Sequence, residues 1–290
     1  MSKVLYIIIT PVRNEEKYLQ GTIESVASQT LRPALWVIVN DGSTDNTRNI
    51  IDRAAAAYPW IKAVHRADRG FRKPGGGVIE AFYDGYALAA GEAWDFIVKL
   101  DGDLSFDSTF FERSFERFET DGALGVGGGT ICGLREGVLV EEAKGDPAFH
   151  VRGATKMYRR ACWEAIGGLV KAPGWDTLDE IKANMSGWRT YTFRDLKLHQ
   201  HRHTGAAEGL WKDWVKNGLA NYITGYHPVF MFFKCLKRGF SEISLTAPAG
   251  LGWGFLSGYL KRVPRTEPDV IRYVRREQVK RLLLQPSLWS

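Results

Sequence analysis

Two aspartates at the end of an apolar run are the residues best suited to chemistry. Asp101 and Asp103 follow the run 95–100, with Gly102 between them. In an extended chain, side chains two residues apart point to the same side, so both carboxylates can face one point. Hard oxygen ligands suit Mg²⁺ or Mn²⁺, and a glycine lets a ligand approach the backbone. We expect half of a divalent-metal site here; a solvated Asp-Gly turn is the alternative.

Asp41 ends a second apolar run, 35–39, in the segment NDGSTDNT. Ser43 or Asp45 is placed to cap the helix that follows, as short polar side chains do at helix starts. Capping gives no role to Asp41. We therefore expect its carboxylate to face a cleft and to accept hydrogen bonds from a base or a ribose.

The segment HRADRGFRKPGGG, residues 65–77, combines cations with glycines. Such a loop suits phosphate oxygens, because the backbone can approach them while Arg and Lys donate charge-assisted hydrogen bonds. It matches neither of the common glycine-rich phosphate motifs, and an ordinary surface loop is the alternative. The residues of this loop that we expect to bind phosphate are Gly70, Arg72, Lys73 and Gly75.

Three acids stand near the start of a predicted helix in GWDTLDEIKA, residues 174–183. Asp176 is placed to be the N-cap, and acids in the first turn interact favourably with the helix dipole. Asp179 or Glu180 then remains to act as the general base beside a reacting hydroxyl, and we favour Asp179. Trp175 and Asp176 are expected on the acceptor side, where Trp175 could stack on a sugar ring or simply belong to the core.

Three of the six histidines alternate, at His199, His201 and His203. In a strand they share one face, so His201 is a candidate third ligand for the metal beside Asp101 and Asp103. A structural role for the histidines is the alternative.

Short apolar runs alternate with helical patterns along the first hundred residues or so. This alternation predicts an α/β fold with a mostly parallel sheet covered by helices on both faces. In such sheets ligands bind beyond the carboxyl ends of the strands, which is where the polar loops fall. Expected strands are residues 4–9, 35–39, 61–66, 95–100, 122–134, 150–160 and 189–193, and expected helices lie around 15–29, 45–57, 78–90, 161–169 and 174–188.

Composition narrows the class of protein. With 44% apolar and 25% charged residues among 290, the chain is that of an ordinary globular protein. Its net charge of +6 favours an anionic partner, but no nucleic acid is expected because basic and acidic residues are mixed along most of the chain. Three distant cysteines fit reduced thiols in a cytoplasmic protein. The first residues predict a strand and not a signal peptide, and no apolar run reaches the ~18–20 residues that span a bilayer.

Residues 211–290 are aromatic and basic and predict a helical extension. Between Lys261 and Arg281 there are eight Lys or Arg residues and three acids. They fit a helix packed on the domain with a solvated basic face. The alternative is peripheral attachment to an anionic membrane, where each basic residue near the surface contributes about 1 kcal/mol.

Taken in order, these segments resemble the family-2 inverting glycosyltransferases of the GT-A fold over roughly residues 4–205. The matching segments are TPVRNEEKYLQGTIESVASQT, VNDGSTDNT, RGFRKPGGGVIEAFYDGYALA, DFIVKLDGDLSF, GATKMYRRACWEAIGGL and DTLDEIKANMSGWRT. The resemblance implies a Rossmann-like GT-A domain over 1–210, with a nucleotide-binding half (1–104) and an acceptor-side half (105–210), followed by the helical extension 211–290. It also implies a donor of the UDP- or GDP-sugar type and a divalent metal, Mn²⁺ or Mg²⁺.

The resemblance also implies roles for single residues. The family usually writes its late acid pair Glu-Asp, whereas this chain has Asp-Glu. The Q-x-x-R-W motif of processive synthases is absent, which favours transfer of a single sugar. The residues concerned are Thr10, Pro11, Arg13 and Glu15 for the nucleotide pocket, Asp41 for the base, Asp101, Gly102 and Asp103 for the D-x-D metal and diphosphate motif, and Asp179 and Glu180 for the catalytic pair.

The implied activity is inverting transfer to an acceptor hydroxyl on a glycan or a lipid-linked intermediate of cell-surface polysaccharide synthesis, in the cytoplasm or on the inner face of the membrane. A sugar-phosphate nucleotidyltransferase is the main alternative, because it shares the sheet, the metal and the aspartates but needs no acceptor-side base. A carbohydrate- or nucleotide-binding module would leave the carboxylates at both places unexplained.

Overall fold

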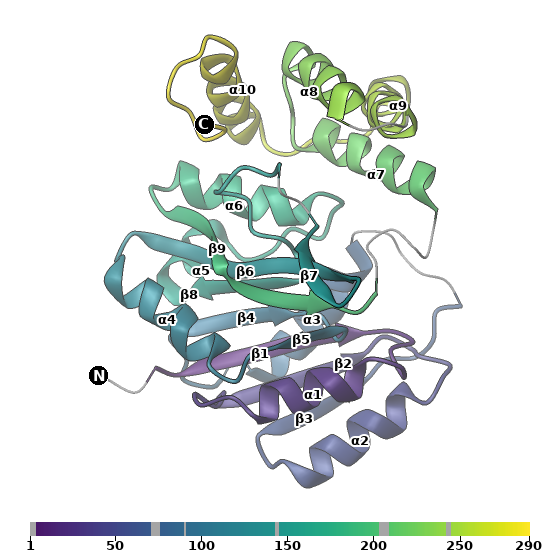
Figure 1. Ribbon diagram of the computed structural model, residues 1–290, viewed down its shortest axis with the longest axis vertical. Coiled ribbons are helices and arrows are strands. Elements are labelled where there is room, and N and C mark those ends of the chain that lie inside the picture. Colours follow the sequence, from purple (N-terminus) through teal and green to yellow (C-terminus); the bar gives the residue numbers. More distant parts are fainter. Residues whose placement is uncertain (1–3, 71–75, 90, 143–144, 203–208, 242–244) are drawn as a thin grey trace.

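The computed structural model describes residues 4–70, 76–89, 91–142, 145–202, 209–241 and 245–290 (Figure 1). Within these residues one sheet has the strand order β3-β2-β1-β4-β8-β6-β9-β5, and β7 pairs with β6 off this path. The strands are β1 (Tyr6–Val12), β2 (Leu35–Asn40), β3 (Ile61–His65), β4 (Phe96–Leu100), β5 (Leu104–Phe106), β6 (Leu124–Arg135), β7 (Val138–Glu141), β8 (Thr155–Arg159) and β9 (Arg189–Gln200).

Helices cover both faces of the sheet and build a separate layer at one end of the molecule (Figure 1). They are α1 (Leu19–Ala27), α2 (Thr47–Ala57), α3 (Gly76–Ala89), α4 (Phe110–Thr120), α5 (Arg160–Ile166), α6 (Trp175–Met185), α7 (Leu210–Ile223), α8 (Pro228–Ser241), α9 (Thr246–Leu260) and α10 (Pro268–Leu282).

The first half of the sheet has the predicted parallel arrangement. β1 pairs in parallel with β2 and with β4, and β2 pairs in parallel with β3. In β1, Tyr6 and Ile8 join the core beneath α1, α2 and α4, whereas Ile7 and Ile9 join the core beneath α3, α5 and α6. Because both faces are covered, these strands consist of continuous apolar runs, which is what made them predictable.

The second half of the sheet is mixed. β8 runs antiparallel to β4 and β6, while β9 runs parallel to β6. The predicted strand 189–193 continues through His199 to Gln200 as one long strand, β9, with a register shift opposite Gly129 and Thr130, and His201 follows this strand. The short strand β5, just after the two aspartates, pairs with the end of β9 and so brings the histidine segment beside them.

The helical extension packs on the sheet domain through α6. Leu178 and Ile181 of α6 share one apolar cluster with residues of α7, α9 and α10. Glycines set the close packing of α7 on α9, since a Cβ on Gly254 would lie only 2.0 Å from the Val215 carbonyl oxygen. Among the helices of the described residues, none is both long enough and apolar enough to cross a bilayer.

Candidate active site at the carboxyl ends of β1 and β4

Asp101 and Asp103 leave the end of β4 as the sequence predicted. The Asp101 amide donates to the carbonyl oxygen of Ala154 at 2.8 Å, which ties the turn to the start of β8. Gly102 has a packing role that the sequence did not indicate, because a Cβ there would lie 2.5 Å from Val12 Cγ1 at the end of β1. The glycine therefore lets the two strand ends approach each other.

The two carboxylates differ in exposure. The Asp103 residue is buried, and the Asp101 side chain is 30% exposed. Burial, and then repulsion by Asp101, raise the pKa of Asp103 to about 6, although a hydrogen bond from the Gln200 amide at 3.2 Å opposes the shift. A negative charge on the buried Asp103 beside that of Asp101 is therefore unfavourable unless a further cation balances it.

Lys99 is a site residue that our sequence reasoning missed. It lies on β4 two residues before Asp101, so that both side chains point to the same side. Its buried ammonium group contacts the Asp101 carboxylate and the Gly153 carbonyl oxygen, the latter at 2.5 Å. A single lysine in the middle of the apolar run IVKL was the signal available.

A third carboxylate joins this group from the end of β1. Glu15 forms an ion pair with Arg202, which follows β9. Burial raises the pKa of Glu15 to about 7; Arg202 opposes this shift, and the charges of Asp103 and Asp101 add to it. The structure thus brings the predicted residues Glu15, Asp101 and Asp103 into one electrostatic neighbourhood and adds Arg202 to it.

The structure does not place His201 in a ligand set with the two aspartates. Its Nε2 lies 3.0 Å from Ser105 Oγ, and its ring stacks on Tyr18 with ring centroids 5.9 Å apart. Burial, and then the neighbouring His199, lower the pKa of His201. Across the described ranges no group of three or more His, Cys, Asp or Glu side chains is arranged to hold a metal, and His203 lies outside those ranges.

Asp41 lies at the end of β2, and two arginines already contact its carboxylate. Arg66 Nη1 is 2.6 Å from one oxygen and Arg69 Nη2 is 2.5 Å from the other. Arg13 donates to the Asp41 carbonyl oxygen at 2.7 Å and forms an ion pair with Asp68. Two guanidinium groups that the sequence did not assign thus stand beside the residue expected to read the base.

Other expected pocket residues differ in their accessibility. Thr10 and Pro11 are buried, and the Thr10 hydroxyl accepts a hydrogen bond from Trp36 Nε1 at 2.9 Å, so the Thr10 side chain lies in the core. Gly70 has a left-handed backbone with φ of 73° and open space where a Cβ would stand. Arg72, Lys73 and Gly75 lie outside the described residues.

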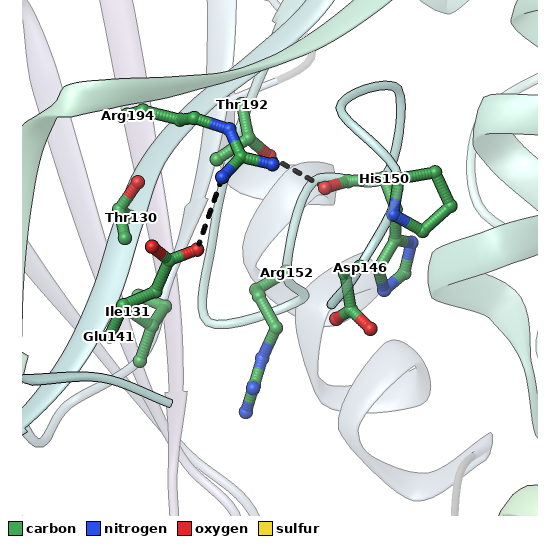
Figure 2. Close-up of a pocket in the computed structure, with 9 residues that line it drawn as sticks. Thr130, Ile131, Glu141, Asp146, His150, Arg152, Thr192 and Arg194 are labelled. Carbon is green, nitrogen blue, oxygen red and sulfur yellow. Dashed lines mark hydrogen bonds and ion pairs between the residues drawn. The ribbon is translucent and has the colours of Figure 1, made fainter. Parts of the chain in front are cut away.

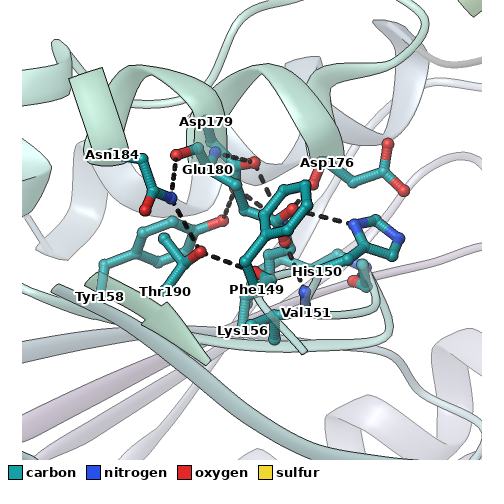
Figure 3. Close-up of polar contacts among 12 residues, drawn as sticks. Phe149, His150, Val151, Lys156, Tyr158, Asp176, Asp179, Glu180, Asn184 and Thr190 are labelled. Carbon is teal, nitrogen blue, oxygen red and sulfur yellow. Dashed lines mark hydrogen bonds and ion pairs between the residues drawn. The ribbon is translucent and has the colours of Figure 1, made fainter. Parts of the chain in front are cut away.

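The prediction that Asp179 or Glu180 is the base does not fit the structure, because both residues are 0% exposed (Figure 3). Lys156 Nζ lies 2.9 Å from both Asp179 oxygens and 2.7 Å from Glu180 Oε1. The Tyr158 hydroxyl also donates to Asp179. Burial raises the pKa of Asp179 to about 6, against the opposing charge of Lys156.

Glu180 has further partners in the same cluster. It accepts a hydrogen bond from the Val151 amide at 2.6 Å and lies 2.9 Å from His150 Nδ1. Burial lowers the pKa of His150, but the charge and the hydrogen bond of Glu180 raise it to about 9. Both carboxylates of the expected catalytic pair are therefore matched by cations, the buried Lys156 and the partly buried His150.

Asp176 occupies a different position from the one expected of an N-cap. The N-cap residue of α6 is Gly174, in a left-handed conformation, so Asp176 lies within the first turn of the helix. Asp176 is only partly buried, and its carboxylate points away from the buried pair (Figure 3). A Cβ on Gly153 would lie 3.4 Å from Asp176 Cβ. The Gly153 carbonyl accepts from Lys99, which also contacts Asp101, and this chain of contacts places Asp176 near the β4 aspartates.

Trp175 is buried, which does not fit stacking on an acceptor sugar. Its ring contacts both buried lysines, which lie opposite each other in the pairing of β4 with β8, with Lys99 Nζ at 5.4 Å and Lys156 Nζ at 5.6 Å from the ring centroid. Both distances are in the range of cation–π contacts. Trp175 therefore contacts both the lysine that pairs with Asp101 and the lysine that pairs with Asp179.

A small cavity lies beside this region, between β6, β9 and the segment 146–152 (Figure 2). Arg194 forms an ion pair with Glu141 at 3.8 Å across it, and the Thr192 hydroxyl donates to the His150 carbonyl oxygen at 2.6 Å. Its volume of about 20 Å³ is near that of a single water site and too small for a sugar. The cavity is therefore not the substrate site.

Comparison with known proteins identifies the family of the chain. The model of the family described as "Glycosyl transferase family 2" matches residues 7–168. An uncharacterised glycosyltransferase of Nostoc sp. is 38% identical over 114 residues, which are 39% of this chain and 32% of the relative. A Bacillus subtilis relative, uncharacterised glycosyltransferase EpsJ, is 31% identical over 115 residues, 40% of this chain and 30% of its own. The matches thus span about a third of these curated relatives.

Solved structures show the same fold at low sequence identity. A mannosyltransferase of Pyrobaculum calidifontis in complex with GDP-Man and Mn²⁺ superimposes with a TM-score of 0.54 at 15% identity, covering 91% of this chain and 76% of that one. S. aureus TarS 1–349 in complex with UDP-GlcNAc gives a TM-score of 0.55 at 16% identity and covers 96% and 81%. The predicted GT-A fold is confirmed, and the chain belongs to glycosyl transferase family 2.

Proposed function

We propose that this chain transfers one sugar from a nucleoside-diphosphate sugar to an acceptor hydroxyl, with inversion at the anomeric carbon. The observation that carries the proposal is the chain of contacts from Asp101 through Lys99 and Gly153 to Asp176. These contacts connect the acidic pair Asp101 and Asp103, the proposed diphosphate and metal side, with the partly exposed carboxylate of Asp176. GDP-Man and UDP-GlcNAc in the similar structures support a donor of this class.

Asp101 and Asp103 are the residues that would hold a divalent metal. Their chemistry fits one, because burial and mutual repulsion make the second negative charge unfavourable until a cation is near. Such a metal, when bound, offsets the charge that develops on the departing diphosphate. The Mn²⁺ in the Pyrobaculum calidifontis complex supports metal use here. We propose that water and donor oxygens complete the metal's ligands, with no contribution from His201.

We propose Asp176 as the general base in place of Asp179 and Glu180. Its carboxylate accepts the proton of the acceptor hydroxyl while the acceptor oxygen bonds to the anomeric carbon. The bond from that carbon to the diphosphate oxygen breaks, and its electron pair leaves with the nucleoside diphosphate. One displacement from the opposite face inverts the centre.

Asp41 remains our candidate for reading the base. A carboxylate offers about four acceptor sites, and the two arginine contacts leave room for a base N–H. Arg66 and Arg69 hold the carboxylate in place, and Arg13 fixes the backbone beside it. Glu15 and Gly70 complete the nucleotide side of the proposed pocket.

The proposed acceptor is a class of molecule that carries a free sugar hydroxyl. We propose a glycan or a lipid-linked glycan intermediate of cell-surface polysaccharide synthesis, acted on in the cytoplasm or at the inner face of the membrane. Transfer of a single sugar is proposed because the motif of processive synthases is absent.

The test measures thermal stabilisation by a panel of UDP- and GDP-sugars with and without Mn²⁺, and then the anomeric configuration of the product by NMR. A true donor at 100 times its dissociation constant should add about 2.7 kcal/mol to the free energy of unfolding. The stabilisation should depend on Mn²⁺ and disappear in Asp103→Asn. Release of pyrophosphate from a nucleoside triphosphate and a sugar phosphate would instead show a nucleotidyltransferase.

A further inference from the structure

Large apolar side chains gather on the exposed faces of α8 and α9, far from the aspartates. On α8 the exposed stripe recurs at intervals of three and four residues, which places its members on one side of the helix. Its most exposed members are Phe232 (63%) and Phe240 (84%). The α8 stripe consists of Val229, Phe232, Phe233, Leu236 and Phe240, and the α9 stripe of Trp253, Leu256 and Leu260.

Both stripes are turned away from α7. The opposite side of α9 packs on α7 through Gly250, Gly254 and Gly258, where an added Cβ would clash with α7 atoms. The opposite side of α8 contacts Asn221 of α7, with its Nδ2 3.8 Å from the Met231 sulfur. The α8 and α9 stripes therefore lie on the side of the helical layer that faces away from α7, at the end of the molecule opposite α2 (Figure 1).

Cations border these stripes. Residues 210–265 contain eight Lys or Arg residues and two acids. Exposed members lie on the helices of this layer and in the segment after α9: Lys212 and Lys216 on α7, Lys237 on α8, and Lys261, Arg262 and Arg265 after α9. Two copies of this chain meeting through the face would bring like charges together, whereas a negatively charged surface would be attracted.

We propose that the face formed by the α8 and α9 stripes docks on an anionic lipid bilayer surface, with its aromatic and aliphatic side chains inserted and its cations at the headgroups. Apolar stripes flanked by Lys and Arg are typical of helices that lie in a membrane interface. Docking at this face does not depend on the identity of the donor or of the acceptor.

This face differs from the segment 261–281, which the sequence analysis gave as an alternative site of membrane attachment, although Lys261, Arg262 and Arg265 belong to both. On α10, Arg272 pairs with Asp269, Lys280 Nζ lies 2.6 Å from Glu277, and Arg275 donates to the Gly225 carbonyl oxygen at 3.1 Å. These cations are partly neutralised or serve the packing of α10. The α8 and α9 stripes, by contrast, consist of exposed apolar side chains, and exposed cations lie on the same helical layer.

The test is sedimentation of the whole chain with vesicles of phosphatidylcholine alone or mixed with equal phosphatidylglycerol, at about 0.05 M and about 0.5 M salt. Wild type should bind the anionic vesicles at low salt and lose most of that binding in phosphatidylcholine vesicles or at high salt. Phe232→Ser/Phe240→Ser should lower the partition coefficient about tenfold or more, because two exposed aromatic side chains no longer insert. Lys237→Glu/Lys261→Glu should lower it similarly.

Leu88→Ser/Val138→Ser is the matched control, since both side chains are exposed (55% and 63%) but lie on α3 and β7. It should bind as wild type does. Circular dichroism checks that each variant is folded, and light scattering measures its mass. Absence of wild-type binding at low salt, or equal binding by Phe232→Ser/Phe240→Ser, would overturn the proposal. A dimer that dissociates in this variant, without vesicle binding, would assign the face to a second copy.

Discussion

Two groups of neighbouring carboxylates in this protein differ in their exposure and in their balance of charge. At the end of β4, Glu15, Asp101 and Asp103 are three carboxyl groups near two cations, Lys99 and Arg202. On α6 the two carboxylates of Asp179 and Glu180 are matched by Lys156 and His150. The first group has an excess of acid and is partly exposed, whereas the second is buried and neutralised.

The difference teaches that residue type and adjacency do not decide a role. A buried and paired carboxylate is needed for the fold, because removing its partner leaves an uncompensated charge. A carboxylate group with unbalanced charge at a sheet edge is suited to attract a cation. Substitutions in one group or the other should therefore have different effects.

The largest expected effect is on stability. Lys156→Met should lower the free energy of unfolding by about 3–5 kcal/mol, since two buried carboxylates lose their shared partner. Urea unfolding measures it. Arg160→Ala, which removes an exposed ion pair with Glu164, is the control and should cost about 1 kcal/mol or less. Equal effects of the two substitutions would show that the α6 cluster is not a buried structural network.

Asp103→Asn should lower the transfer rate by about 10²–10³-fold with little loss of stability, because it removes charge from the metal and diphosphate side. Turnover with an identified donor and acceptor, in saturating Mn²⁺, measures the rate, and circular dichroism confirms the fold. Asp107→Asn, on the exposed turn after β5, is the control. Near-wild-type turnover of Asp103→Asn would remove the basis for a metal site at the end of β4.

A smaller effect is expected from pH. The pKa of His150 is raised from 6.5 to about 9, so its ion pair with Glu180 is fully formed below pH 6.5 and is lost as pH rises through 9. The free energy of unfolding should fall by about 3 kcal/mol across that window in wild type, relative to His150→Asn. Urea titrations at several pH values measure both proteins. Parallel curves would mean that His150 does not carry this charge.

The sequence predicted the sheet edge well for a local reason. β1 to β4 are apolar runs, and residues two apart on an extended chain must point the same way. The positions of Asp101 and Asp103 at the end of β4 could therefore be predicted from the sequence. The position of Lys99, two residues before Asp101, could have been predicted in the same way. The second half of the sheet was harder, because β8 and β9 are placed by pairing with strands distant in the chain.

The helix α6 could not be oriented from its sequence. Its N-cap is Gly174 and not Asp176, and a helix turns by about 100° per residue. A two-residue error at the cap therefore exchanges the side chains that face the site with those that face the core. Nothing local indicates that Lys156, from β8, is the partner that buries Asp179 and Glu180.

The most direct test compares Asp176→Asn with wild type in a single-turnover experiment at saturating donor and acceptor. The account predicts a transfer rate about 10²–10⁴-fold lower, since the proton acceptor is lost, while donor binding and the unfolding midpoint stay unchanged. A rate within threefold of wild type for Asp176→Asn would contradict it and return the role of base to another carboxylate.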